Sequence, residues 1–190
     1  MSRWEPDARG RLGKAAMELF DERGYEQTTV AEIAKRAGLT ERTFFRHYAD
    51  KREVLFAGSP ILQNTVVDAL TATPEGTAPF DAVVAGIQAA AHEMFRGAHA
   101  HARRRHAIVS AHGDLREREL VKLATLSAAL AGTLRERGVP EPTASLSAEA
   151  GVGVFRVSFE RWVDEADAPR ELSDVIGESL TAFRALTPET

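Results

Sequence analysis

Apolar residues recur at helical spacing through most of the chain, and glycine or proline separates the helical stretches. Near the N-terminus, residues three and four apart predict an amphipathic helix that ends at Arg23-Gly24, with an inner face formed by Leu12, Ala15, Ala16, Leu19 and Phe20. A second, shorter stripe follows Thr29 and consists of Val30, Ile33, Ala34 and Ala37. A third short helix places Phe44 and Tyr48 on one inward face, because they lie four residues apart. Three packed helices are therefore expected before residue 50.

Residues that start and stop helices lie between these stripes. Thr29 and Glu32 have the spacing of a capping box, and Thr40 can cap the following helix. Gly38 lies between the two, where a helix end favours a left-handed residue. Two short helices joined by a glycine turn have the spacing of a helix-turn-helix, which lays its second helix in the major groove of DNA.

The outer face of that second helix carries side chains suited to DNA. With the two aromatic residues inside, a rotation of about 100° per residue turns Arg42 and Arg46 away from the core. Thr43 and Phe45 flank them, and the set can form guanine, hydroxyl and thymine-methyl contacts. Lys51 lies where phosphates would pass. Between residues 35 and 52, six basic residues stand against two acidic ones, a local charge of +4 in a chain of net charge −4.

The stretch from Leu12 to Leu55 resembles the DNA-binding domain of the tetracycline-repressor (TetR) family. The residues that carry the resemblance are Phe20, Gly24-Tyr25, Thr28-Thr29-Val30, Ile33-Ala34, Ala37-Gly38, Phe44, Tyr48 and Lys51. The resemblance implies a homodimeric transcriptional regulator, usually a repressor that a small molecule releases from its operator. By position it assigns DNA contacts to Thr29, Thr40, Arg42, Thr43, Phe45, Arg46, His47 and Lys51. Many members have tyrosine where this chain has Phe45, and the missing hydroxyl removes one phosphate contact.

The rest of the chain is also predicted to be helical. Asp50 and Glu53 form a pair of the capping type that opens a helix at Lys51, and Gly58-Ser59-Pro60 interrupts this helix, with Ser59 as a possible cap. The predicted helices cover residues 51–71, 80–96, 101–111, 115–137, 146–164 and 171–186. The predicted fold is all-α with about nine helices: a helix-turn-helix domain at 1–55 and a larger ligand-binding and dimerisation domain at 56–190.

The segment GVGVFRVSF at 151–159 is ambiguous. Glycine and β-branched residues favour a strand, whereas Val154, Phe155, Phe159 and Trp162 form a helical stripe. We favour the helix because an isolated strand would have no partner.

Composition narrows the class of protein. There is no cysteine, so disulfides and thiolate catalysis are excluded. We find neither a secretion signal nor an apolar run of membrane-spanning length, and expect a cytoplasmic protein. A phosphate-binding glycine loop and a nucleophile elbow are absent, so we expect neither an enzyme nor a cofactor. Five histidines fall between 92 and 112, but no carboxylate lies at ligand spacing beside His99 and His101, and no metal site is predicted.

We therefore expect a DNA-binding regulator, with double-stranded operator DNA, a small-molecule effector and a second copy of the chain as partners. The predicted dimer interface uses the helices at 146–164 and 171–186, through Val154, Phe155, Phe159, Trp162, Val175, Ile176, Leu180 and Phe183. Effector contacts are predicted at Ile87, His92, Met94, Phe95, Leu126, Leu130 and Phe155, a lining that suits a largely hydrophobic molecule. The alternatives are a helical small-molecule-binding protein or enzyme whose turn motif is incidental, and a sequence-indifferent DNA-compacting protein.

Overall fold

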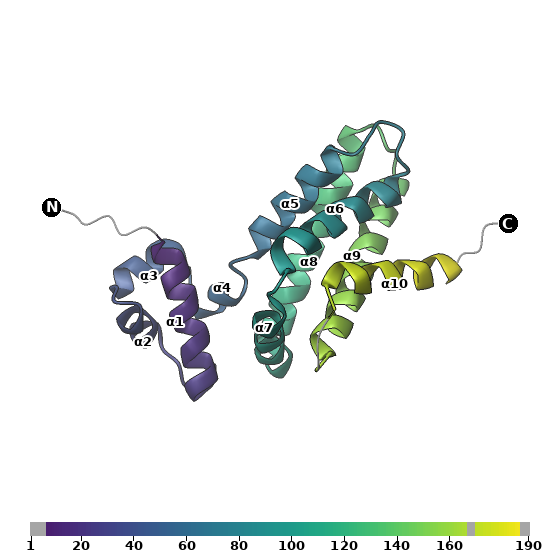
Figure 1. Ribbon diagram of the computed structural model, residues 1–190. Helices are drawn as coiled ribbons and strands as arrows, with labels where there is room; N and C mark the ends of the chain where they lie inside the picture. The colour runs from purple at the N-terminus through teal and green to yellow at the C-terminus, as the bar shows by residue number, and fades with distance from the viewer. Residues whose placement is uncertain (1–6, 167–169, 187–190) are drawn as a thin grey trace.

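The computed structural model describes residues 7–166 and 170–186, and this part of the chain folds into ten α-helices without strands. The helices are α1 Ala8–Arg23, α2 Val30–Arg36, α3 Glu41–His47, α4 Lys51–Leu55, α5 Ser59–Thr71, α6 Pro79–Phe95, α7 His99–Ala111, α8 Gly113–Glu136, α9 Thr143–Asp164 and α10 Leu172–Leu186. Figure 1 shows α1–α3 as one group, α4 as a short connection, and α5–α10 as a larger bundle. The all-α prediction is confirmed. None of the described helices is long and apolar enough to cross a membrane.

The predicted helix boundaries in the N-terminal part are confirmed by the caps. Thr29 Oγ1 accepts the Glu32 amide at 3.3 Å, and Glu32 Oε2 accepts the Thr29 amide at 2.9 Å, which completes the capping box. Gly38 has φ +67°, the left-handed conformation expected at the turn. Thr40 Oγ1 accepts the amide of Thr43 at 3.2 Å and so caps α3.

Other boundaries differ in part from the prediction. The interruption predicted at Gly58-Ser59-Pro60 is confirmed as a complete break between α4 and α5, and counting the two pieces separately raises the number of helices from about nine to ten. Gly58 is the N-cap of α5, and Ser59 is its first residue rather than its cap. Asp50 caps α4 as predicted, but the Glu53 carboxylate turns away from the helix end to bind Arg118 and Lys122 of α8. A local capping pattern could not anticipate partners more than sixty residues away.

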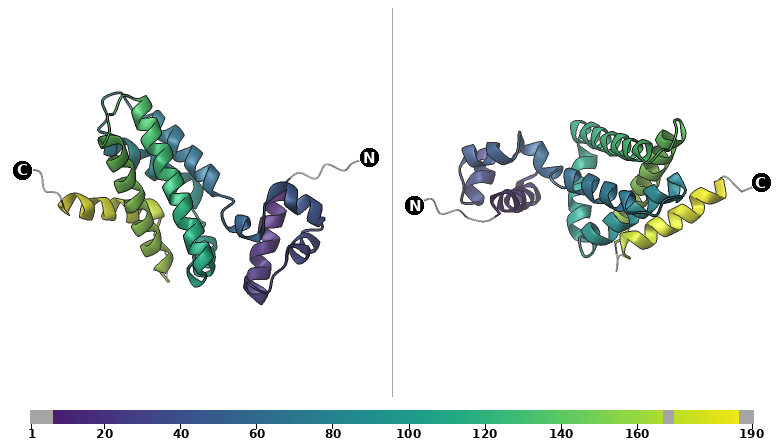
Figure 2. Two further views of the ribbon diagram at one scale, coloured as in Figure 1. Left: turned by 180° about the vertical axis from the view of Figure 1, so that it is seen from behind. Right: turned by 90° about the horizontal axis from the view of Figure 1, so that it is seen from above.

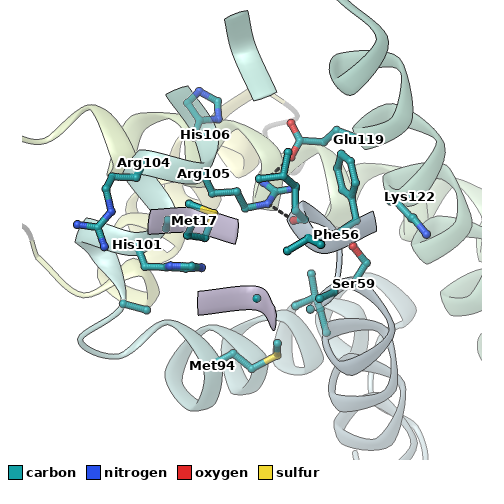
Figure 3. Close-up of a pocket in the computed structure, with 18 of the residues that line it drawn as sticks. Met17, Phe56, Ser59, Met94, His101, Arg104, Arg105, His106, Glu119 and Lys122 are labelled. Carbon is teal, nitrogen blue, oxygen red and sulfur yellow. Dashed lines mark hydrogen bonds and ion pairs between the residues drawn. The ribbon is translucent and has the colours of Figure 1, made fainter. Parts of the chain in front are cut away.

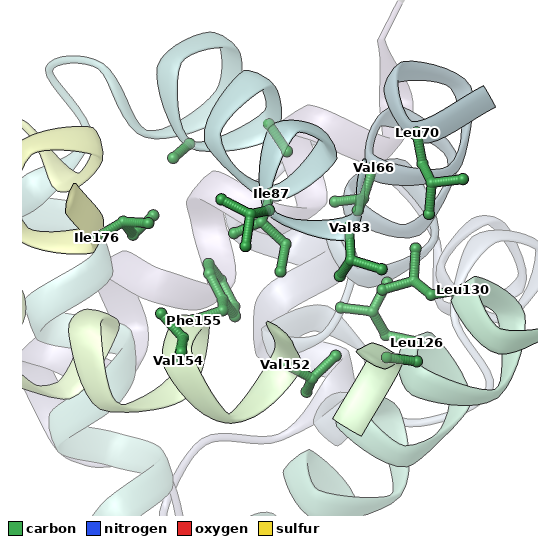
Figure 4. Packing of buried hydrophobic residues seen from close by; sticks show 14 of the residues in the cluster. Val66, Leu70, Val83, Ile87, Leu126, Leu130, Val152, Val154, Phe155 and Ile176 are labelled. Atoms are coloured by element: carbon green, nitrogen blue, oxygen red, sulfur yellow. The ribbon is translucent and has the colours of Figure 1, made fainter. Parts of the chain in front are cut away.

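Two apolar clusters hold the helices together. The larger one joins α5, α6, α8, α9 and α10, and Figure 4 shows Val66, Val83, Leu130 and Phe155 packed within it. The smaller one contains buried residues of α1–α4 together with Val109 of α7 and Leu115 of α8. The turn from α7 to α8 is thus packed against the N-terminal helices, and the views in Figure 2 agree with this placement. Burial of a Val or Leu side chain stabilises by about 1.5–3 kcal/mol, so this contact fixes how the two groups meet.

The predicted dimer residues prove to belong to the single chain's own core. Six of them are buried in the larger cluster: Val154, Phe155, Trp162, Val175, Ile176 and Leu180. Phe159 and Phe183 are half-buried and pack against the same cluster. These side chains therefore stabilise the single chain, because the strongest apolar stripes of α9 and α10 face each other and α6. That α9 and α10 also form the dimer interface stays a prediction.

The segment at 151–159 is helical as predicted, and Gly151 supplies the physical reason for its unusual composition. A Cβ at Gly151 would lie 2.4 Å from Cγ1 of Val83 on α6, closer than two carbon atoms can pack. The glycine lets α9 approach α6 directly. Its role is close helix packing rather than strand formation.

We expect Gly151→Ala to lower the free energy of unfolding by about 1–3 kcal/mol, because the stiff side chain of Val83 cannot move aside without strain. The matched control is Gly132→Ala in α8, whose new Cβ would meet only Arg135 Nη2 at 3.8 Å. This control should gain about 0.5–1 kcal/mol from reduced backbone freedom. Urea unfolding measures the free energy of unfolding of both variants. An equal increase in the two variants would contradict the packing role of Gly151.

Candidate nucleic-acid interface and adjoining cavity

The outer face of α3 presents two arginines and a phenylalanine to solvent. Arg42 and Arg46 are exposed, and Phe45 is 55% exposed. Together with Thr43 they border a small hollow on the surface. Within the described part of the chain, neither arginine makes a hydrogen bond or an ion pair. Both guanidinium groups are therefore available to an external partner.

Two other cations of the same region, Arg36 and Arg52, are already paired. Arg36 donates to both carboxylate oxygens of Glu22 at 2.7 and 2.8 Å, and this bond lowers the pKa of Glu22 below its ordinary value. Arg52 binds Asp50, and the hydrogen bond raises the pKa of Arg52. Both arginines were included in the net charge of +4 between residues 35 and 52, but their charges are largely neutralised by these carboxylates. The structure instead distinguishes Arg42 and Arg46 as the cations of α3 without a partner in the described chain.

The orientation of α3 is fixed by the contacts of its inner face with α1. Phe44 is fully buried, and its ring centroid lies 5.5 Å from that of Tyr48. The Tyr48 hydroxyl donates to the carbonyl of Arg9 on α1 at 3.1 Å, while burial raises the pKa of this phenol. Because the inner face of α3 is attached to α1, the opposite face with Arg42 and Arg46 cannot rotate inward.

The remaining predicted DNA contacts lie at the edges of this face. Thr29 and Thr40 are exposed caps whose hydroxyls bond to Glu32 and to Thr43 respectively. His47 is half-buried, and among the described residues its buried Nε2 has no hydrogen-bond partner. Their contacts with DNA remain predictions.

Lys51 is bound to the loop between α1 and α2. Its Nζ donates to the carbonyls of Tyr25, Glu26 and Thr28 at 2.9, 3.2 and 3.2 Å, and lies 4.4 Å from the centroid of the Tyr25 ring. Desolvation raises the pKa of that tyrosine to about 12. All three protons of the ammonium are thus directed at the loop between α1 and α2. Lys51 attaches α4 to this loop, and its predicted phosphate contact remains untested.

A cavity of about 1000 Å³ adjoins this domain. One wall is α1, and the others come from α4–α9. Figure 3 shows Met17 of α1 next to the cationic side chains of α7, with Met94 of α6 on another part of the wall. Most of the lining is apolar. A cavity of this size can enclose most of a small organic molecule.

Four of the predicted effector residues line this cavity: Met94, Phe95, Leu126 and Phe155. Three do not. Ile87 and Leu130 are buried behind the wall, and His92 is exposed on the surface. His101 and His106 of α7 line the cavity as well, a placement that depends on the tertiary fold and that no local sequence pattern indicates.

Metal binding by the histidines finds no support in the described residues, which contain no group of three or more His, Asp or Glu placed to hold an ion. The Nε2 of His99 is instead bonded to the carbonyl of Trp162 at 2.8 Å.

Comparison with known proteins identifies the helix-turn-helix. The sequence model described as "Bacterial regulatory proteins, tetR family" matches residues 12–57. Residues 12–57 thus carry the DNA-binding segment of the TetR family. It is 38% identical over 81 residues to the HTH-type transcriptional regulator TcmR of Streptomyces glaucescens, a match that covers 43% of this chain and 36% of TcmR. The matched stretches span about a third to a half of the curated relatives, 36% of TcmR and 48% of a Mycobacterium tuberculosis regulator.

Solved structures of TetR-family proteins share the whole fold. FadR of Thermus thermophilus, a repressor in complex with lauroyl-CoA, superposes with a TM-score of 0.53 over 96% of both chains at 23% identity. SmeT, the repressor of a Stenotrophomonas maltophilia efflux pump, gives a TM-score of 0.59 over 94% of this chain and 89% of SmeT at 19% identity. Likeness at this identity establishes the shared arrangement of helices.

We expect Lys51→Met to lower the free energy of unfolding by about 1–3 kcal/mol, because three backbone carbonyls lose a charged donor and two of these bonds are partly buried. The matched control is Lys35→Met on α2, an exposed lysine for which the described residues provide no partner. Denaturant unfolding followed by circular dichroism measures the difference. If the two variants are equally stable, the three bonds of Lys51 contribute nothing measurable.

Proposed function

We propose that the protein is a transcriptional regulator, a repressor that binds a palindromic DNA operator as a homodimer and is released by a small molecule in the cavity. The observation that carries the proposal is the outer face of α3, where Arg42 and Arg46 are exposed without partners on a helix fixed by its caps and by Phe44. The match to the TetR family supports it, and FadR and SmeT are described as repressors. In this proposal residues 1–55 read DNA, residues 56–190 bind the effector and dimerise, and the protein acts in the cytoplasm without catalysis.

The family match favours this function over the two alternatives, and DNA-binding measurements separate all three. A small-molecule-binding protein or enzyme with an incidental turn motif predicts no salt-dependent binding to DNA. A DNA-compacting protein predicts binding without preference among sequences. A regulator predicts both salt dependence and a preferred inverted repeat whose half-sites are separated by whole helical turns.

The α3 face can be tested on DNA selected from a random duplex library by the unaltered protein. Arg42→Ala and Arg46→Ala should each weaken binding to the selected sequence, by about 1–3 kcal/mol for a residue that contacts guanine through two hydrogen bonds. The alanine variant of the arginine that contacts guanine should also lose its base preference at one base pair per half-site. Fluorescence anisotropy at fixed salt measures both effects.

The control is Arg103→Ala, which removes the same charge from an exposed position of α7. It should leave affinity for the selected sequence nearly unchanged. Selection that enriches no sequence would contradict the proposed function, and unchanged affinity and preference in both α3 variants would contradict this assignment of the reading face.

An exposed apolar stripe on α9 supports dimerisation through a different face from the one predicted. Leu146, Ala150, Gly153 and Val157 follow one another at spacings of four, three and four residues, the spacing of a packed helix seam. Leu146 is 65% exposed and Val157 is 44% exposed in the single chain. We propose that this stripe faces its counterpart across the two-fold axis.

Val157→Glu should give a folded monomer of 20.7 kDa where the unaltered protein gives a dimer, because two buried carboxylates would face each other at the axis. Static light scattering with circular dichroism measures mass and fold together. Val121→Glu, the same change at an exposed position of α8, is the control and should remain dimeric. A dimeric Val157→Glu protein would place the interface elsewhere.

A further inference from the structure

Arg105 of α7 touches both the cavity and the end of α4. Its Nε donates to the carbonyl of Leu55, the last residue of α4, at 2.6 Å. Its Nη1 binds Oε1 of Glu119 at 2.8 Å, and its guanidinium lies 5.0 Å from the centroid of the Phe56 ring. Figure 3 shows both bonds at the wall of the cavity. The side chain is only 19% exposed, and among the described residues Nη2 has no hydrogen-bond partner.

The cavity wall around Arg105 is positively charged. The parts of α7, α8 and α9 that line it contribute five cations, Arg104, Arg105, Arg116, Lys122 and Arg156. The same helices contribute two carboxylates to the lining, Glu119 and Glu160. The α1 side adds two cations and three carboxylates, so cations outnumber carboxylates by seven to five in the whole lining. Burial, followed by the charges of Arg104 and Arg105, lowers the pKa of His101 in the same wall. The groups around the guanidinium therefore favour an anion over a cation.

The rest of the lining favours an apolar molecule. Met94, Phe95, Phe155 and Phe159 gather at the junction of α6 and α9, with Leu126 of α8 beside them. The ring centroids of Phe155 and Phe159 lie 6.1 and 5.8 Å from that of Phe95, so these side chains form one continuous surface. Such a surface can cover a hydrocarbon chain or ring system but offers it few hydrogen bonds.

We propose that the cavity binds an amphipathic acid, a molecule with an extended apolar body and one carboxylate, and that Arg105 anchors the carboxylate. The inference rests on the proposed effector role of the cavity. Nη1 and Nη2 form the edge of the guanidinium that matches a carboxylate through two parallel hydrogen bonds. Glu119 now occupies part of that edge, so the incoming acid competes with Glu119. Because Nε of the same group holds the Leu55 carbonyl, an acid that draws Arg105 toward itself also changes the attachment of α4.

Binding can be followed without DNA through the fluorescence of Trp162, whose ring lies 5.9 and 6.0 Å from those of Phe95 and Phe159. The sequence has one other tryptophan, Trp4, and Trp4→Phe leaves Trp162 as the single reporter. The probes are decanoate, decanol and decyltrimethylammonium below their micelle concentrations, which share a chain and differ in head-group charge. Decanoate should bind about tenfold or more tighter than the other two, as expected for charge-assisted hydrogen bonds.

Variants of the anchor should shift decanoate affinity in opposite directions. Arg105→Gln should weaken decanoate by about tenfold or more and leave decanol unchanged, whereas Glu119→Gln should tighten decanoate by removing its competitor. Arg103→Gln is the matched control on α7, lies outside the cavity lining and should change neither probe. Arg105→Lys, which keeps the charge but not the planar fork, should fall between the parent and Arg105→Gln.

The tightening expected for Glu119→Gln cannot arise from damage to the fold, so the test remains decisive if Arg105→Gln is unstable. Equal affinity for the three probes, no binding of decanoate, or no gain in Glu119→Gln would each overturn the proposal. These titrations contain no DNA, so their failure leaves the proposed operator binding intact. Conversely, failure to select an operator would contradict the proposed function and leave the acid site standing as a binding site.

Discussion

Helices of five and seven residues do not form by themselves, and the part of this protein that we propose reads DNA combines three such helices, α2, α3 and α4, with α1. Isolated helices shorter than about 12–15 residues are marginal in water. The seven residues of α3 are held by the Thr40 cap, by the full burial of Phe44, and by the bond from Tyr48 to the carbonyl of Arg9. The exposed face with Arg42 and Arg46 exists as a defined surface only because the opposite face is attached to α1.

The five-residue helix α4 is subject to the same constraint and is held at both ends. At its start, Lys51 donates to three carbonyls of the loop between α1 and α2. At its end, Arg105 of α7 donates to the Leu55 carbonyl, where a cation also interacts favourably with the helix dipole. Between the two, Glu53 accepts bonds from Arg118 at 2.8 Å and from Lys122 at 3.4 Å. The first of these attachments lies within the N-terminal helices and the others come from the C-terminal bundle, so α4 couples the two groups.

Features fixed by neighbours in the sequence were predictable, and features fixed by distant partners were not. The caps at Thr29 and Thr40, the left-handed Gly38 and the inward Phe44 depend on spacings of a few residues, and the structure confirms them. The pairing of Arg36 with Glu22 and the cavity formed by α1 and α7 depend on the tertiary fold. The burial of the side chains expected at the dimer interface has a related cause. Sequence periodicity identifies the most apolar face of α9, and the single chain buries that face in its own core.

The position of the cavity bears on how a ligand can act on the α3 face. A ligand shifts a conformational equilibrium only by its differential affinity for the two states. A cavity enclosed by one rigid bundle would have the same shape in both states and would need a relay to reach the DNA-reading helices. Here Met17 and Asp21 of α1 form part of the wall, opposite residues of α6–α9, and α1 carries α3 through Tyr48. The volume of the cavity therefore depends on where the N-terminal helices stand, and a molecule that fills it discriminates between their positions directly.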